Sequence, residues 1–408
     1  MVLTSIDLFC GAGGLTEGFK QAGFECLYGN DANSYAIETF QSNHPRSWAD
    51  PRPIQQVDAR SVRRKLGLNK GELSALTGGP PCQGFSINAP DRFLKDPRNT
   101  LFRQYVRFID EFEPQTLVFE NVPGMLSLAD GHVFEQVKKE IEKLGYAVSA
   151  RILFAAHYGV PQERWRLIII GSRRKPIPEF PEPTHYATGR ANFRGGKTLT
   201  FRLLPLQKQL LAPAVTVADA LSDLPRLARG EGGPVVRYER KAESVYAKLM
   251  RNGDIETYNH HAGVLSSQNV ERLKHIRPGG SWRDIPFHLL PKGMKRARKS
   301  DHTKRYGRLK AEGLAATIMT KCDPHWGPVF LPDQDRALTV REAARLQSFP
   351  DNYRFQGSRV SQYQQVGNAV PVLMAKAIAE TISRHLLGET GERATWRLES
   401  LSFSATAR

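Results

Sequence analysis

The stretch SIDLFCGAGGLTEGFKQA, Ser5 to Ala22, passes from an apolar run through a glycine-rich turn into an amphipathic pattern. Ser5–Phe9 is typical of a short buried strand, and Leu15–Ala22 is typical of a helix with one apolar face. A strand, a tight turn and a helix in this order form the opening unit of an α/β fold. The stretch therefore predicts a doubly wound, mostly parallel sheet of the Rossmann-like kind.

Further apolar runs in the first third of the chain also end in residues whose side chains can bind a ligand or take part in a reaction. After Phe9 with its glycines, the runs end at Asp31, Asp58, Cys82 and Glu120. In an open parallel sheet the carboxyl ends of the strands meet at one edge, where ligands bind. The sequence therefore predicts one composite site at that edge. Two later strands, SARILFA and WRLIIIGS, complete the expected sheet.

The glycine-rich turn indicates a cofactor. Gly11 and Gly13 allow the backbone to approach a ligand closely, but the spacing does not continue as the G-x-G-x-x-G of dinucleotide sites. Asp31, about twenty residues further on, is placed to accept hydrogen bonds from ribose hydroxyls. Asp58 could accept one from an adenine amino group. A nucleoside ligand without phosphates fits this set better than NAD.

A second chemical group is the thiol of Cys82 in LTGGPPCQGFSINAP, Leu76 to Pro90. Pro80 and Pro81 restrict the backbone before it and so fix where the sulfur points. Glu120, in FENVPG, is expected one strand away. A thiolate paired with a carboxyl group, without a histidine base, suits addition to an electron-poor ring, where the acid engages a ring nitrogen while sulfur attacks carbon.

Composition places the chain among globular proteins that bind a polyanion. Its 408 residues carry a net charge of +17, and Ser172–Lys310 holds 28 lysines and arginines against 12 aspartates and glutamates. Such a localised excess is the footprint of nucleic-acid binding. No apolar run is long enough for a membrane span, and no secretory signal precedes the first strand. Four scattered cysteines predict no metal site and no disulfide framework, and a reducing cytoplasm.

Changes in composition and in apolar periodicity along the chain predict the domain organisation. We expect a catalytic domain over residues 1–171, a loop-rich basic domain over 172–325, a return segment over 326–388 that completes the first domain, and a polar, frayed tail over 389–408. In the return segment, Leu338–Pro350 and the stretch from Pro371 to Gly388 have helical patterns. Within the first of these, Arg341, Arg345 and Gln347 are expected to brace the basic domain. His260–His261 is expected to be a surface pair.

Six motifs, taken together, resemble those of the DNA cytosine-5 methyltransferases of bacterial restriction–modification systems. In order they are DLFCGAGG, GGPPCQGFS, ENVPGM, YGVPQERWRLIIIG, VREAARLQSFPDNY and QVGNAVP. The resemblance spans Ile6 to Pro371 apart from the basic segment. It implies S-adenosylmethionine as cofactor, a target cytosine flipped out of the duplex, and a target recognition domain in the position of the basic segment.

The resemblance also implies roles for individual residues. Cys82 would attack C6 of the cytosine, Glu120 would engage N3 and the exocyclic amine, and C5 would then take the methyl group. Arg164 and Arg166 would hold O2, the backbone and the carboxylate network, with Gln162 in support. The residues implied to line or close the cofactor pocket are Phe9, Asp31, Asp58, Ala59, Leu101, Asn368 and Val370.

Two other functions stay open at this point. One is an RNA cytosine-5 methyltransferase with the same catalytic core, and the other is a non-catalytic DNA-binding regulator. The basic segment of about 140 residues suits recognition of a duplex rather than an RNA, and a mere binder has no need of the Cys82 thiol. The expected partner is therefore double-stranded DNA, with a cognate restriction endonuclease acting separately unless the enzyme is an orphan methylase. We expect a cytoplasmic, nucleoid-associated monomer.

Overall fold

A seven-stranded sheet forms the centre of the catalytic part of the chain in the computed structural model, which describes residues 2–81, 101–191, 193, 199–200, 203, 205–301 and 304–389. The strand order is β3-β2-β1-β4-β5-β8-β6. The first five of these strands run parallel, and β8 runs antiparallel to both of its neighbours. This confirms the predicted mostly parallel α/β fold. The strands are β1 Leu3–Leu8, β2 Phe24–Asn30, β3 Trp48–Asp50, β4 Ala75–Gly78, β5 Thr116–Asn121, β6 Ala147–Phe154 and β8 Trp165–Ser172.

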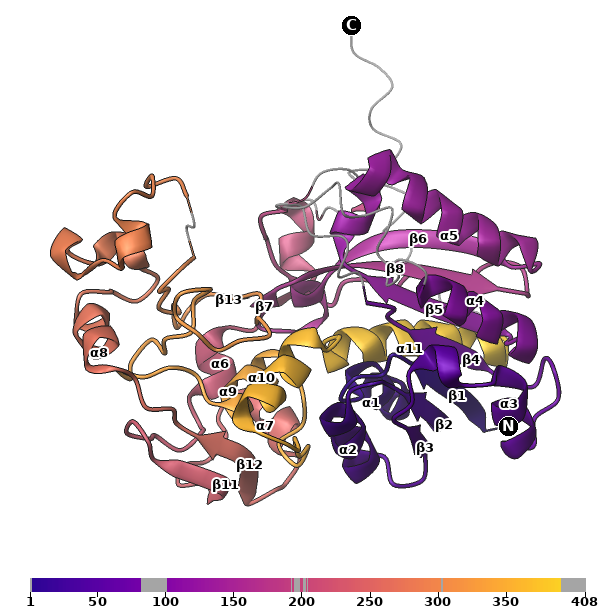
Figure 1. Ribbon diagram of the computed structural model, residues 1–408, viewed down its shortest axis with the longest axis horizontal. Coiled ribbons are helices and arrows are strands. Elements are labelled where there is room, and N and C mark those ends of the chain that lie inside the picture. Colours follow the sequence, from indigo (N-terminus) through magenta and orange to yellow (C-terminus); the bar gives the residue numbers. More distant parts are fainter. Residues whose placement is uncertain are drawn as a thin grey trace, which may run out of the picture.

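Helices cover both faces of the sheet because consecutive strand residues are apolar, and successive side chains point to opposite faces. Leu117 and Phe119 of β5 point into one apolar cluster with α3, α4 and α5, whereas Val118 points into another with α1 and α11. Figure 1 shows α11, from near the end of the chain, running beside α1. The helices are α1 Gly14–Gln21, α2 Ser34–Asn43, α3 Ala59–Lys65, α4 Leu101–Phe112, α5 His132–Lys143 and α11 Val372–Leu387.

The predicted strand ending at Asp58 is wrong. Residues 54–56 form a short 3-10 turn, and Asp58 is the N-cap of α3, where its carboxylate accepts hydrogen bonds from the amides of Arg60 and Ser61. The third strand is instead β3, which ends at Asp50, because Pro51 has no amide hydrogen with which to continue the ladder.

The basic middle segment contains only short elements. Part of it packs on the sheet, since Phe180 and Ala187 lie in clusters with residues of β6. Residues of α6 and α7 pack instead with the return segment, on the left of Figure 1. The domain boundaries at 171 and 325 stay a prediction. Its elements are β9 His185–Tyr186, β10 Ala212–Pro213, α6 Val217–Leu221, β11 Gly232–Arg237, α7 Val245–Arg251, β12 Glu256–His261, α8 Ser267–Lys274 and β13 Ala315–Ala316. The short strand β7 Gln162–Glu163 lies before this segment and pairs with β13.

Short stretches of 3-10 helix also occur between these elements. They are η1 Ile54–Gln56, η4 Pro123–Gly131, η5 Ala155–Tyr158, η7 Pro205–Gln209, η8 Trp282–Asp284, η9 Phe287–Leu289 and η10 Lys292–Met294. In the part of the chain that the structure describes, no helix combines the length and the apolarity that a membrane crossing requires.

The return segment begins with α9 Val340–Leu346 and α10 Arg359–Asn368. Thr339 caps α9 through a capping box with Glu342, and the Glu342 carboxylate also forms a buried ion pair of 2.7 Å with Arg336. On the same helix, Arg345 bonds to both Asp223 and Asp351. Arg341 is also fully buried and donates to the Tyr258 carbonyl of the basic segment, so the two arginines brace that segment as expected. The expectation is wrong for Gln347, whose side chain bonds to Gln162, Val366 and Ala369, outside the basic segment.

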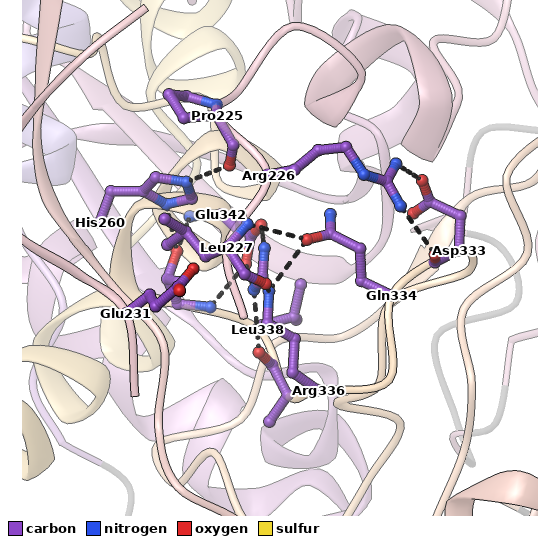
Figure 2. A network of polar contacts seen from close by, with 12 residues as sticks. Pro225, Arg226, Leu227, Glu231, His260, Asp333, Gln334, Arg336, Leu338 and Glu342 are labelled. Atoms are coloured by element: carbon purple, nitrogen blue, oxygen red, sulfur yellow. Dashed lines mark hydrogen bonds and ion pairs between the residues drawn. The ribbon is translucent and has the colours of Figure 1, made fainter. Parts of the chain in front are cut away.

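His260 contradicts the predicted surface pair. His261 is exposed, but His260 at the end of β12 is fully buried. Its imidazole bonds to the Thr339 hydroxyl at 2.9 Å. It also bonds to the Pro225 carbonyl at 2.8 Å, a contact that Figure 2 shows near Arg336 and Glu342. Burial lowers the pKa of His260, so the ring is neutral and joins β12 to α9. Strand alternation puts one of two adjacent residues inside, which the sequence pair alone did not show.

Candidate active site

Glu120 and Arg166 form the centre of the site. They lie at the ends of the antiparallel neighbours β5 and β8, and their side chains meet in an ion pair of 2.7 Å between Oε1 and Nε. Each side chain is 12% exposed, so the pair is nearly removed from water. Burial raises the pKa of Glu120, and the charges of Arg166 and Arg164 oppose that shift. The result is a carboxyl group that binds a proton more readily than a surface glutamate does.

The chain that leads to Cys82 passes directly beside this pair. A Cβ atom added to Gly79 would lie 2.8 Å from Glu120 Oε2, so a larger residue there would displace the Glu120 carboxyl group. The next residue, Pro80, is held by its carbonyl, which accepts a hydrogen bond of 3.2 Å from the Asn121 amide. Cys82 itself lies outside the described residues, and its predicted role stays a prediction.

Arg164 is fully buried and binds backbone rather than a carboxylate. Its guanidinium donates to the carbonyls of Ile318 at 3.2 Å, Gly367 at 2.8 Å and Ala369 at 3.0 Å. Its Nε atom has no hydrogen-bond partner within the described ranges. The two predicted arginines therefore have different contacts. Arg166 pairs with Glu120, whereas Arg164 joins the later segments of the chain to the sheet.

The glycine-rich turn lies at the end of β1. Phe9 and Gly11 both have positive φ angles, 58° and 53°, so the backbone turns sharply after the strand. The Gly11 amide donates to Asp31 Oδ2 at 2.9 Å, and the Asn33 amide donates to Oδ1 at 2.8 Å. Nothing lies within 4 Å of a Cβ atom added to Gly11. The turn is thus held to the end of β2 and leaves open space above Gly11.

The far side of the turn packs against the end of the chain. A Cβ atom on Gly14 would lie 2.6 Å from the Val370 carbonyl oxygen, and one on Gly13 would lie 2.7 Å from the Tyr353 hydroxyl. Asn368, two residues before Val370, is exposed. The structure therefore brings the predicted Val370 against Gly14 of the glycine-rich turn, although the two lie more than 350 residues apart in the sequence.

The remaining predicted cofactor residues fall into two groups. Ala59 and Leu101 are buried in one apolar cluster against which Phe9 also packs. Asp58 is exposed at the N-cap of α3, and its hydrogen bonds with Ser61 lower its pKa. It therefore remains an anion with one face toward solvent.

Two acids that sequence reasoning missed lie close to this turn. Asp7, inside β1, is buried and accepts a bond of 2.6 Å from the Thr16 hydroxyl, and burial raises its pKa to about 6. Asp50 ends the true third strand, where Tyr28 and Arg52 bond to its carboxylate. The sequence offered one signal for each acid. Asp7 is a charged residue inside the apolar run SIDLF, and Asp50 stands just before Pro51, where a strand would end.

Other features of the described residues lie apart from this site. A cavity of about 810 Å³ lies between α1, α2 and the stretch after α9, and it is lined by Glu17, Lys20, Asn43, Tyr353 and Lys376 among others. None of the residues that line it is a predicted site residue. Within the described ranges, no group of three or more histidines, cysteines and acids is placed to hold a metal ion.

Comparisons with known proteins agree with the geometry. A family model described as C-5 cytosine-specific DNA methylase matches residues 3–384. The chain is 35% identical to the Type II methyltransferase M.AgeI of Thalassovita gelatinovora, across 93% of this chain and 99% of that protein. It is 34% identical to M.DdeI of Desulfomicrobium norvegicum, across 93% and 88%. Its fold is similar to a solved DNA modification methyltransferase from an E. coli prophage, with a TM-score of 0.70, 23% identity and coverage of 94% and 99%.

Proposed function

The chain belongs to the C-5 cytosine-specific DNA methylases, and from that premise we propose that it methylates C5 of a cytosine flipped out of duplex DNA, through a covalent bond between Cys82 and C6. The observation that carries this proposal is the buried Glu120–Arg166 pair beside the backbone that leads to Cys82. A buried acid whose pKa is raised, beside the chain that leads to a thiol, is the combination that attack on a pyrimidine ring requires.

The protein residues would act in sequence on one base. The Cys82 thiolate adds to C6, and the electron pair of the C5–C6 bond moves toward N3, where Glu120 provides the proton or hydrogen bond. Arg166 holds the Glu120 carboxyl in place through their ion pair. C5 thereby becomes an enamine-like nucleophile. After methylation, loss of the C5 proton to a base restores the double bond and releases the thiolate.

The residues around the glycine-rich turn fit S-adenosylmethionine. When bound, this cofactor supplies an electrophilic methyl group on a sulfonium. The open space at Gly11 gives room for a ligand. The Asp31 carboxylate accepts hydrogen bonds from two backbone amides and has further lone pairs with which to accept from ribose hydroxyls. The apolar cluster of Phe9, Ala59 and Leu101 suits a flat purine ring. Asp58, Asn368 and Val370 would complete the pocket.

The proposed substrate rests on the charge of the basic segment, and the proposed biological role rests on similarity to Type II methyltransferases. The basic middle segment would bind the phosphates of duplex DNA, and its short elements would read the target sequence. Similarity to Type II methyltransferases supports a protective role in a restriction–modification system, with a separate endonuclease, or an orphan methylase. The protein would act as a cytoplasmic, nucleoid-associated monomer.

The test uses labelled S-adenosylmethionine with duplex DNA, single-stranded DNA or tRNA. We expect label in duplex DNA, and a duplex carrying 5-fluorocytosine in the target should form an adduct that survives denaturation, because fluorine cannot leave as a proton does. Cys82→Ser should form none. Glu120→Gln should lower the rate by about 100-fold or more, since it removes the proton donor.

The outcomes separate the alternatives. Label in tRNA alone would indicate an RNA methyltransferase, and no label in any substrate would favour a DNA-binding regulator. An adduct that persists in Cys82→Ser would refute the assignment of the nucleophile.

A further inference from the structure

Five residues form a closed ring of hydrogen bonds behind the site. Gln162 accepts from the Ile318 amide at 3.0 Å, and the Ile318 carbonyl accepts from Arg164 at 3.2 Å. Arg164 also donates to the Ala369 carbonyl at 3.0 Å, which accepts a second bond, of 3.3 Å, from Gln347. Gln162 donates to Gln347 Oε1 at 3.1 Å and so closes the ring.

This glutamine–arginine ring joins three parts of the chain that are distant in sequence. Gln162 and Arg164 come from the stretch just before β8, and Ile318 follows β13, which pairs with β7 at the border of the basic segment. Ala369 lies beside Val370, whose carbonyl touches Gly14 of the turn. The ring therefore connects the catalytic sheet, the basic segment and the wall of the cofactor site.

Gln347 is the member of the ring that holds the cofactor wall. Its side chain is fully buried, and its amide group donates to the Val366 carbonyl at 2.8 Å as well as to Ala369. Its own backbone carbonyl accepts from the Val372 amide, the first residue of α11. Gln347 thus grips the segment 366–372 at both ends.

We propose that Gln347 is a positioning residue that sets the segment 366–372 against the glycine-rich turn and, through the ring, holds it in register with Ile318. The wall of the cofactor site and the basic segment are then fixed relative to one another before the cofactor or DNA binds. This inference rests on the proposed function for the identity of the cofactor, but the position of Gln347 and its bonds do not.

The test is Gln347→Glu, which keeps the shape of the side chain but removes the amide donors. A carboxylate would repel the carbonyls of Val366 and Ala369. We expect the dissociation constant for S-adenosylhomocysteine, measured by calorimetry, to rise about tenfold, because the bonds that Gln347 donates to Val366 and Ala369 are both lost. Hydrogen exchange should also become faster in peptides covering residues 315–320 and 366–374.

Gln365→Glu is the matched control. Gln365 is only 3% exposed, on α10, and its amide group bonds to Thr39, Gln356 and Ser361, outside the ring. The same chemical change there should reduce thermal stability comparably while cofactor affinity stays within about twofold of the wild type.

Three results have distinct meanings. Cofactor affinity unchanged in Gln347→Glu, or weakened equally in Gln365→Glu, would overturn the proposal. If the wild type binds no S-adenosylhomocysteine, the proposed function fails, and hydrogen exchange then decides alone. Faster exchange confined to Gln347→Glu supports the positioning role, and equal exchange in the two variants refutes it.

Discussion

Single buried groups carry much of the electrostatic character of this protein. Asp7 is 1% exposed within β1, and its pKa is raised from 3.8 to about 6 by burial, although Thr16 and Thr77 bond to it. The folded protein therefore holds a proton on Asp7 at a pH where the unfolded chain has lost it. Below about pH 4 both states are protonated, and as the pH rises toward 6 the folded state loses stability.

Asp7→Asn should remove this pH dependence. The amide oxygen can still accept from Thr16, but the side chain no longer ionises. The stability of the variant relative to the wild type should therefore improve by about 3 kcal/mol between pH 4 and pH 7.5. Urea unfolding of both proteins at the two pH values measures this change. A difference that is independent of pH would show that Asp7 does not titrate in this range.

Sequence patterns located some of these residues and missed others for physical reasons. Asp31 and Glu120 follow long apolar strands, so the strand-end rule placed them correctly. Asp58 failed because Ile54 and Val57 are buried at a spacing that a turn followed by a helix also satisfies. The bonding of Arg164 to carbonyls of residues 318, 367 and 369 depends on contacts over 150 residues or more, which no local pattern contains.

At the scale of elements, the close approach of α1 and α11 closes the sheet on one face. Gly18 permits it, because a Cβ atom there would lie 2.4 Å from Ala375 Cβ and 2.6 Å from the Lys376 backbone nitrogen. Both helices were predicted from their apolar faces, but their pairing was not, because periodicity shows which face is buried and not what covers it. The strand β3 was missed because it is only three residues long.

Gly18→Ala should destabilise the protein, although alanine favours an isolated helix by about 1 kcal/mol. The added methyl group forces α1 and α11 apart, at a cost of about 1–3 kcal/mol. Thermal unfolding should show a lower Tm than the wild type. Gly124→Ala is the control, since a Cβ atom there meets nothing within 4 Å, and it should leave Tm nearly unchanged. Equal or higher stability of Gly18→Ala would contradict this packing.

At the scale of the whole molecule, buried ion pairs fasten the middle segment to the return segment. Arg345 of α9 bonds to Asp223, just after α6, and to Asp351, and Asp223 also bonds to Arg251 of α7. The concentration of positive charge was evident in the sequence. The shared core of residues 217–250 and 338–372 was not evident in the sequence, because contacts between residues distant along the chain decide which segments pack together.

Asp223→Asn should cost about 3 kcal/mol of stability, because it leaves part of the charge on two buried arginines without a partner. Asp333→Asn is the matched control, since the Arg226–Asp333 pair joins the same two segments but is about half exposed (Figure 2). It should cost about 1 kcal/mol or less. Denaturant unfolding of the two variants gives the comparison, and similar losses would mean that burial does not decide the strength of these pairs.

The packing of α11 on α1 has a consequence for how the protein is made. Leu15 and Phe19 leave the ribosome early, yet their apolar partners Met374 and Ile378 emerge some 350 residues later. At roughly 5–20 residues per second that interval is on the order of tens of seconds. During most of synthesis the nascent chain therefore exposes apolar side chains of α1, to which a chaperone could bind. The contact between Val370 and the glycine-rich turn, which would close the proposed cofactor pocket, can form only when translation is nearly finished.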